Sequence, residues 1–269
     1  MSFSRTTRTV LLLLSGLVLL FIYAPLALVL LNSFNTSRTF EWPPTGYTTR
    51  WWSAAIDNPG ARNAIVVSLE VALVATAIAL VLGTMAALAL QRFRFFGRDT
   101  VSLLVILPIA LPGVVTGIAL ANAFLTIFGI ELGFFSLVVS HATFCMVTVF
   151  NNAIARLRRL GGNLEEASMD LGAGTIRTFW SVTLPMMRSA LLAGALLSFA
   201  LSFDEIIVTT FTAGSGVQTL PIWIYQNLFR PNQAPVVNVV AAALIVLSVI
   251  PIWLSQKLAG TDESVAAAR

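Results

Sequence analysis

Long runs of apolar residues, separated by short polar segments, dominate the hydropathy pattern of this chain. A helix needs about 20 apolar residues to cross the hydrocarbon core of a bilayer, and these runs are too continuous for the alternating strands of a membrane barrel. The pattern therefore predicts an all-α membrane protein with six transmembrane helices. The expected spans cover residues 10–31, 63–90, 101–125, 134–155, 188–212 and 236–257.

The composition supports this interpretation. Hydrophobic residues make up 57% of the chain and charged residues 10%, whereas soluble proteins carry about 25% charged residues. The basic residues behind the net charge of +4 are spread between the apolar runs, which argues against a nucleic-acid-binding surface, where they would cluster. No internal repeat or soluble domain interrupts the spans, so we expect one transmembrane domain over residues 1–269. The single cysteine, Cys145, predicts neither a disulfide nor a metal site.

The distribution of basic residues indicates an orientation. With a cytoplasmic N-terminus, most of the 16 Lys and Arg residues fall on the cytoplasmic side, as the positive-inside rule requires. The four that fall outside are Arg38, Arg50, Arg62 and Arg230. Both termini are therefore expected in the cytoplasm. The first apolar run resembles a signal sequence but is too long for the core of one, which predicts a retained anchor.

Small residues form a stripe along the second expected span. They are Ala75, Ala79, Gly83 and Ala87, each four residues from the next. In lipid, such a stripe lets a neighbouring helix approach closely.

The third expected span contains two prolines, Pro108 and Pro112, within Leu107–Gly113. Each proline frees a carbonyl group four residues earlier, and a freed carbonyl at membrane depth needs a protein or water-lined neighbour. The segment is either a kinked packing helix or part of a discontinuous helix around a transport site.

Aromatic residues and prolines gather in the two expected external loops, residues 32–62 and 213–235. Aromatic side chains near the ends of spans usually form the interfacial belt of a membrane protein. A docking surface for an external partner is the alternative.

The longest expected cytoplasmic segment, residues 163–185, has the pattern of two short helices. Asn163 is expected to cap the first helix, with Glu166 returning a hydrogen bond from the third helical position. Gly172 and its neighbours end this helix. Thr175 is expected to cap the second, which Leu184-Pro185 closes before the fifth span. Apolar and acidic groups exposed in this way need a partner to cover them.

The same segment resembles the EAA loop of ABC importer permeases. Glu166-Ala167-Ser168 is followed after three residues by Gly172 and after nine more by Val182-Thr183-Leu184-Pro185. The third small residue is Ser168 where the family pattern has Ala. In this family the loop inserts into a groove of a cytoplasmic ATPase. The resemblance assigns ATPase coupling to Glu166, Ala167, Ser168, Asp170, Gly172, Leu184 and Pro185. A capped amphipathic helix lying at the membrane interface is the alternative.

The resemblance extends over nearly the whole chain and narrows to the PotC-like, spermidine/putrescine-type branch of these permeases. The segments that carry it include Leu107–Gly113, His141-Ala142-Thr143-Phe144, Glu166–Gly172 and Ser202–Thr209. It implies one half of a heterodimeric permease in the bacterial inner membrane, paired with a PotB-like subunit, two ATPase subunits and an external solute-binding protein. The chain has no glycine-rich phosphate loop. We therefore expect no catalytic residue and no bound cofactor here, since the separate ATPase subunits use ATP and Mg.

Ionisable residues within the expected spans are candidates for the substrate path, because a charge at mid-membrane costs about 2.5–3.5 kcal/mol on insertion scales. They are Glu70, Asp204, Glu205 and His141. Carboxylates at one depth suit a cationic cargo. Neighbouring helical residues diverge by about 100°, so we expect Asp204 to face the pore and Glu205 to make a helix contact or to lie at the subunit interface. Structural roles are the alternative: Glu70 pairs with Arg62 or His141, the two acids cap a helix break near Ser202, and His141 makes a satisfied contact between helices.

Two other functions are also compatible with the sequence. The cargo of an importer of this kind could be another small solute, such as an amino acid or another amine. Alternatively, Asp204 and Glu70 could carry protons or ions in a secondary transporter that uses no ATPase.

Overall fold

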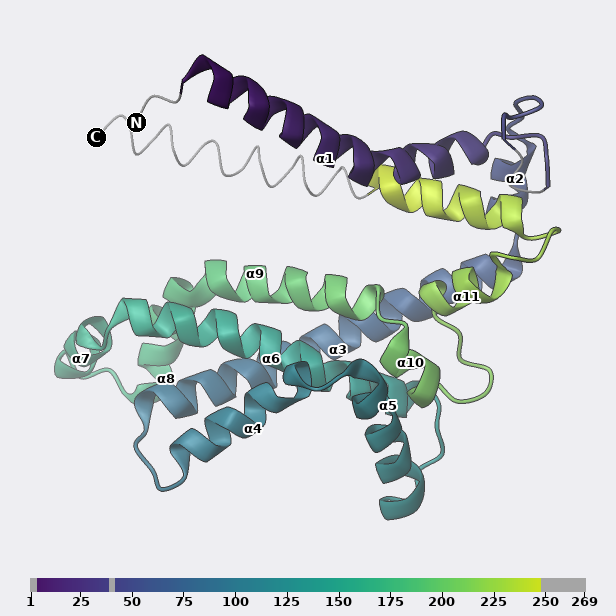
Figure 1. The fold of residues 1–269 in the computed structure, drawn as a ribbon. Coiled ribbons are helices and arrows are strands. Elements are labelled where there is room, and N and C mark those ends of the chain that lie inside the picture. The colour runs from purple at the N-terminus through teal and green to yellow at the C-terminus, as the bar shows by residue number, and fades with distance from the viewer. Residues whose placement is uncertain (1–3, 39–41, 248–269) are drawn as a thin grey trace. The chain divides into compact units, whose positions relative to one another are not determined.

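The computed structural model describes residues 4–38 and 42–247, and helices form almost all of the regular structure in these ranges (Figure 1). The chain divides into two compact units. One contains the residues up to Arg62 together with those from Ile224 onward, and the other contains Asn63–Trp223. Each unit is described by itself below.

Four helical segments in the described part of the chain are long and apolar enough to cross a membrane. They are Arg5–Asn32, Pro59–Arg92, Phe134–Leu160 and Thr175–Phe203. A fifth span is formed if Arg98–Ala110 and Gly113–Ile127, which are bent by 108° relative to each other, are counted together. Helix Ala234–Leu247 covers the start of the sixth expected span, and residues 248–257 of that span lie outside the described residues. The all-helical class is confirmed, whereas the number six stays a prediction.

The first unit contains helices α1 (Arg5–Asn32) and α2 (Arg50–Ile56), the end of α11 (Leu220–Asn227) and helix Ala234–Leu247. Helix α1 contains no buried residue. The segment after it is folded: the Trp51 Nε1–H donates to the carbonyl oxygen of Asn35 at 2.8 Å, and Asn35 pairs with Tyr47 in an isolated bridge. The described residues of the predicted external loop therefore form an ordered structure as well as a group of aromatic residues.

The second unit is built on α3 (Pro59–Arg92), α6 (Phe134–Leu160) and α9 (Leu184–Phe203). The small-residue stripe of α3 faces α6: Ala79 belongs to one buried cluster with Cys145 and Val149. A Cβ atom placed on Gly83 would lie 2.8 Å from the carbonyl oxygen of Met146. The predicted close approach of a second helix to this stripe is confirmed.

Helices α6 and α9 also pack closely, through polar groups that satisfy one another. The Cys145 thiol donates to the carbonyl oxygen of Ser198 at 3.3 Å, and the Ser198 hydroxyl donates to the carbonyl oxygen of Cys145 at 3.1 Å. Both side chains are fully buried. Because lipid offers no hydrogen-bond partners, this reciprocal pair removes the cost of placing two polar groups between helices.

The third expected span is broken into α4 (Arg98–Ala110), α5 (Gly113–Asn122) and the π-helical turn η1 (Ala123–Ile127). Leu111 is extended and Pro112 caps α5, since the residue before a proline is disfavoured in the helical conformation. Pro108 is accommodated inside α4. Of the two alternatives left by the sequence, the structure has the discontinuous helix.

The expectation of one continuous fifth span over residues 188–212 was wrong. Helix α9 ends at Phe203, and a separate helix, α10 (Ile207–Thr212), begins after three intervening residues. The sequence contains neither proline nor glycine at this break. Here the carboxylate of Glu205 accepts a hydrogen bond from the Val208 N–H at 2.8 Å, so a side chain competes with the backbone for a helical donor.

We expect Gly83→Ala to destabilise the second unit by about 1–3 kcal/mol, because the added methyl group meets backbone atoms of α6 that cannot rotate away. The measurement is the midpoint of thermal unfolding in detergent. Gly16→Ala in α1 is the matched control, since no described atom lies within 4 Å of its added Cβ. An equal effect of the two substitutions would contradict the packing role of Gly83.

Candidate functional site

The two helix breaks of the second unit are brought together by the packing of α5 on α10 (Figure 1). A Cβ atom on Gly113 would lie 3.3 Å from Ile207, and one on Gly117 would lie 2.8 Å from the ring of Phe211. Glycine at these positions lets α10 approach α5 without a clash. Discontinuous helices that meet in this way are the arrangement in which membrane transporters build their substrate paths.

His141 on α6 holds the break between α9 and α10. Its Nδ1 lies 2.8 Å from the Ser202 hydroxyl and its Nε2 lies 2.9 Å from the Thr209 hydroxyl, and the ring is fully buried. The Thr209 hydroxyl donates its proton to the carbonyl oxygen of Glu205. Thr209 must therefore accept from the Nε2–H, and Nδ1 accepts from Ser202. His141 thus bridges the end of one helix and the start of the next.

The structure gives different surroundings to the two neighbouring acids. Glu205 is partly buried and caps α10 through its bond to Val208. Asp204 is exposed at the end of α9, and its carboxylate has no hydrogen-bond or ion-pair partner among the described residues. The expectation that both lie on one helix, 100° apart, was wrong because α9 ends before them. The assignment of Asp204 to the substrate path stays a prediction.

Glu70 is exposed on α3, and within the described part of the chain it forms no ion pair. It does not bond to His141, since both ring nitrogens are engaged by other residues. Of the four predicted path residues, the structure therefore brings together His141, Asp204 and Glu205 at one break, and no described contact adds Glu70 to them. Ser202 and Thr209, which complete the network, were not predicted as site residues.

The cytoplasmic segment has the predicted helix-turn-helix form, with α7 (Asn163–Asp170) followed by α8 (Thr175–Thr178). Gly172 has a φ of +86° in the turn, a conformation that favours glycine. Both predicted caps were misplaced by one residue: Gly162 and Gly174 occupy the cap positions, and Asn163 and Thr175 begin the helices. Neither cap makes a side-chain hydrogen bond.

The expectation that Leu184-Pro185 ends the second short helix was also wrong. The π-helical turn η2 (Phe179–Thr183) links α8 to α9, so Thr175–Phe203 is one helix. Pro185 lies in the first turn of α9, where its missing N–H does little harm. The wider π-turn directly before it accommodates the change in the hydrogen-bond pattern.

The predicted coupling residues are mostly on the outside of this segment. Glu166, Ala167, Asp170, Gly172 and Pro185 are exposed, while Ser168 and Leu184 are partly buried. The Ser168 and Thr178 hydroxyls lie 3.1 Å apart and join α7 to α8.

Apolar side chains beside the coupling residues are exposed as well: Leu171 retains 90% of its accessible surface and Ile176 retains 78%. This is an uncovered, partly apolar and partly acidic surface of the kind that a partner protein covers.

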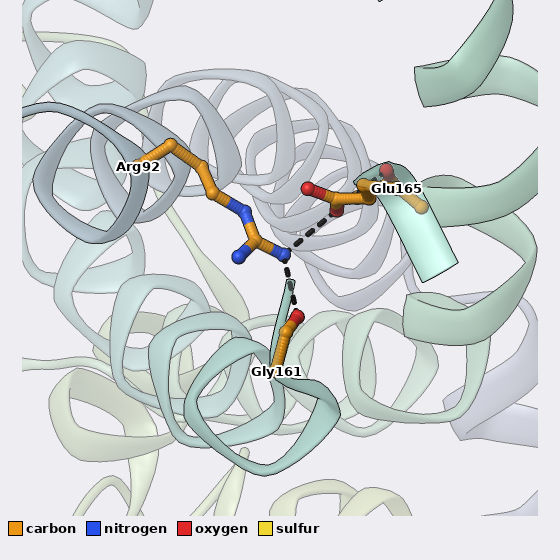
Figure 2. A network of polar contacts seen from close by, with 4 residues as sticks. Arg92, Gly161 and Glu165 are labelled. Carbon is orange, nitrogen blue, oxygen red and sulfur yellow. Dashed lines mark hydrogen bonds and ion pairs between the residues drawn. The ribbon is translucent and has the colours of Figure 1, made fainter. Parts of the chain in front are cut away.

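A second acid of α7, Glu165, is used inside the chain. Figure 2 shows the guanidinium group of Arg92 beside the Glu165 carboxylate and the Gly161 carbonyl group. Arg92 Nη2 lies 2.7 Å from Glu165 Oε1 and 3.1 Å from the Gly161 oxygen. The Thr183 hydroxyl donates to the same carboxylate oxygen at 2.8 Å. The sequence did not indicate this network, because Arg92 and Glu165 are 73 residues apart.

Comparison with known proteins defines the class. A family described as the binding-protein-dependent transport system inner membrane component matches residues 79–259. This chain belongs to that family and is a transport permease subunit of an inner membrane.

Individual relatives show which members of this family the chain resembles. The spermidine/putrescine transport system permease protein PotC of Escherichia coli (strain K12) is 35% identical over 240 residues, which cover 89% of both chains. The putrescine transport system permease protein PotI of the same strain is 34% identical over 84% of this chain and 82% of PotI.

Solved structures share the fold at low sequence identity. A bacterial ABC transporter involved in the import of the acidic polysaccharide alginate contains a chain with a TM-score of 0.72 and 16% identity, covering 97% of this chain and 99% of that one. A chain of an amino acid ABC transporter has a TM-score of 0.59 and 17% identity, covering 78% of this chain and 97% of that one. At these identities the likeness is one of fold.

We expect Thr209→Val to destabilise the permease by about 1–3 kcal/mol, because it leaves the buried Nε2–H of His141 without an acceptor. Thr210→Val is the matched control: its hydroxyl also donates to a carbonyl group four residues earlier, but the residue is exposed and makes no bond to His141. Thermal unfolding in detergent would measure both effects. A loss for Thr210→Val as large as that for Thr209→Val would disprove the role assigned to the histidine bridge.

Proposed function

We propose that this chain is one of two permease subunits of an ATP-driven importer for polyamines such as spermidine or putrescine. The observation that carries the proposal is the identity of 35% to a spermidine/putrescine permease over 89% of both chains. The solved structures that share the fold come from ABC transporters of other cargo, so fold alone does not favour one solute. The extent of the sequence likeness supports a polyamine.

The coupling segment gives this proposal a mechanism. The exposed surface of α7 and the turn at Gly172 would bind a groove of a separate ATPase subunit, with Glu166 as a charged contact. Closure of the ATPase subunits on ATP would move this segment and open the path toward an external solute-binding protein. Hydrolysis of ATP would return the segment to its starting position. In this scheme ATP and Mg are used by the ATPase subunits, and no residue of this chain is catalytic.

The break between α9 and α10 supplies the proposed path for a cation. Asp204 carries a carboxylate that no described side chain neutralises, and it follows the C-terminal end of α9, which is the negative end of the helix dipole. Both features attract ammonium groups. The second permease subunit would supply the other half of the path. The topology that fits this scheme has six spans, with the loop 163–185 and both termini in the cytoplasm.

Uptake of labelled spermidine into proteoliposomes tests the function. With the second permease subunit, the ATPase subunits and the external binding protein present, we expect uptake to require ATP inside the vesicles. Glu166→Lys should reduce the uptake rate by at least about tenfold, because it reverses the charge at the proposed ATPase contact. Asp99→Lys, which reverses another exposed acid expected on the same side of the membrane, should leave the rate within about twofold.

The failures of this experiment are distinguishable. Uptake that follows the membrane potential and persists without the ATPase subunits would show a secondary transporter. ATP-driven uptake of an amino acid in preference to spermidine would change the cargo and leave the importer. Normal uptake by Glu166→Lys would remove the role proposed for α7.

The two neighbouring acids make a matched pair for the path. We expect Asp204→Asn to lower the uptake rate of a polyamine by about tenfold, since one charge-assisted contact is worth about 1.5–3 kcal/mol, without changing the unfolding midpoint. Glu205→Ala should lower the unfolding midpoint, because it removes the cap of α10. A normal uptake rate for Asp204→Asn would contradict the assignment of Asp204 to the substrate path.

A further inference from the structure

Helix α7 is attached to the rest of the permease through glycine at both ends. Gly161 and Gly162 join it to α6, and Gly161 has a φ of +65°. Gly172 and Gly174 join it to α8. Glycine has the greatest backbone freedom of any residue, so these two connections resist rotation of α7 only weakly. A force applied to α7 needs another route into the spans.

Apolar packing does not supply that route. A pocket of about 540 Å³ lies beside α7, lined by residues of α3, α7, α8 and η2. Its wall includes Leu88, Met169 and Phe179. Side chains across a cavity have no atoms in contact and cannot push one another directly. Helix α7, which has no buried residue, therefore borders a half-open pocket and has little apolar packing against the spans.

Polar contacts bridge this gap. Arg92 at the end of α3 binds Glu165 Oε1 and the carbonyl group of Gly161, which follows α6 (Figure 2). The same carboxylate oxygen accepts from Thr183 at the end of η2. The Arg92 and Glu165 side chains are 23% and 17% exposed, so water screens the pair less than it screens a surface pair. Within the described residues Arg92 Nε is buried without a partner, which leaves the contacts of Nη2 to hold the guanidinium group.

We propose that Arg92, Glu165 and Thr183, called here the cytoplasmic clamp, pass the movement of α7 to α3 and, together with the contact between Ser168 and Thr178, to the helix that continues as α9. This proposal rests on the ATP-driven import proposed above. The clamp residues are positioning residues: they touch neither cargo nor nucleotide, and they make α7 move together with the cytoplasmic ends of the spans. Glu166, one position further along the same helix, is exposed and stays available to a partner. Of these adjacent glutamates, Glu165 thus makes contacts within the chain, and Glu166 is exposed to a partner.

The test measures cargo imported per ATP hydrolysed by the complete complex in proteoliposomes, with labelled spermidine as the probe. We expect Glu165→Gln and Arg92→Gln each to lower this ratio by about 2- to 30-fold, the range seen for residues that transmit coupling between sites. ATP hydrolysis and attachment of the ATPase subunits should persist. Arg92→Lys, which keeps the charge and one donor, should give a smaller loss. Arg94→Gln, an exposed arginine two residues away, is the matched control and should leave the ratio unchanged.

Two further variants keep the test decisive. The double variant Arg92→Gln/Glu165→Gln should be no worse than either single variant, because all three remove the same contact. Thr183→Val removes only one donor and should lower the ratio even if the charge variants fold poorly.

The opposing outcomes are distinct from one another. An unchanged ratio in Thr183→Val and the single charge variants, with normal uptake by the wild-type complex, would overturn the clamp alone. Loss of the ATPase subunits from Glu165→Gln would also overturn it, by making Glu165 a docking residue. Absence of ATP-driven uptake by the wild-type complex would overturn the proposed function and the clamp with it.

Discussion

Hydrocarbon offers no hydrogen-bond partner to a backbone, and this constraint decides where the permease can depart from a regular helix. Each break in a span has to be satisfied by groups that the chain itself supplies. At the end of α9 those groups are the Glu205 carboxylate on the Val208 N–H and the His141 ring between Ser202 and Thr209. At the other break the Thr116 hydroxyl donates to the carbonyl oxygen of Pro112. Glycines on α5 then let the two repaired breaks lie against each other. The irregular region is thus stabilised from within the subunit.

Two pairs of neighbouring acids divide their work in the same manner. Glu165 and Glu205 are partly buried and hold elements of the fold together, while Glu166 and Asp204 beside them are exposed. A buried carboxylate must be paired or hydrogen-bonded to offset its lost hydration, and this fixes the geometry around it. The exposed acid beside it is therefore held in a defined position and keeps its charge. In each pair, one acid therefore stabilises the fold, and the acid next to it in the chain stays exposed.

The sequence predicted the parts of this structure that depend on local pattern. Apolar runs indicated the spans, the stripe through Gly83 indicated a close helix contact, and Pro112 indicated either a kink or the first break. The second break was only an alternative at the sequence level, because the contacts that hold it include His141, 61 residues before Ser202. Arg92 was interpreted only as a topology signal, since its partner Glu165 is distant in sequence. The caps of α7 and α8 were misplaced by one residue because glycine met the backbone requirement without a side-chain bond.

The unbroken helix from Thr175 to Phe203 can act as a lever. Its 29 residues, at about 1.5 Å each, make a rod of about 43 Å. A tilt of about 5° at one end displaces the other by about 4 Å over that length. The far tip of this rod is Phe203, directly before Asp204. A small swing at the Thr175 end of this rod is therefore transmitted directly to the break between α9 and α10, with no intermediate joint.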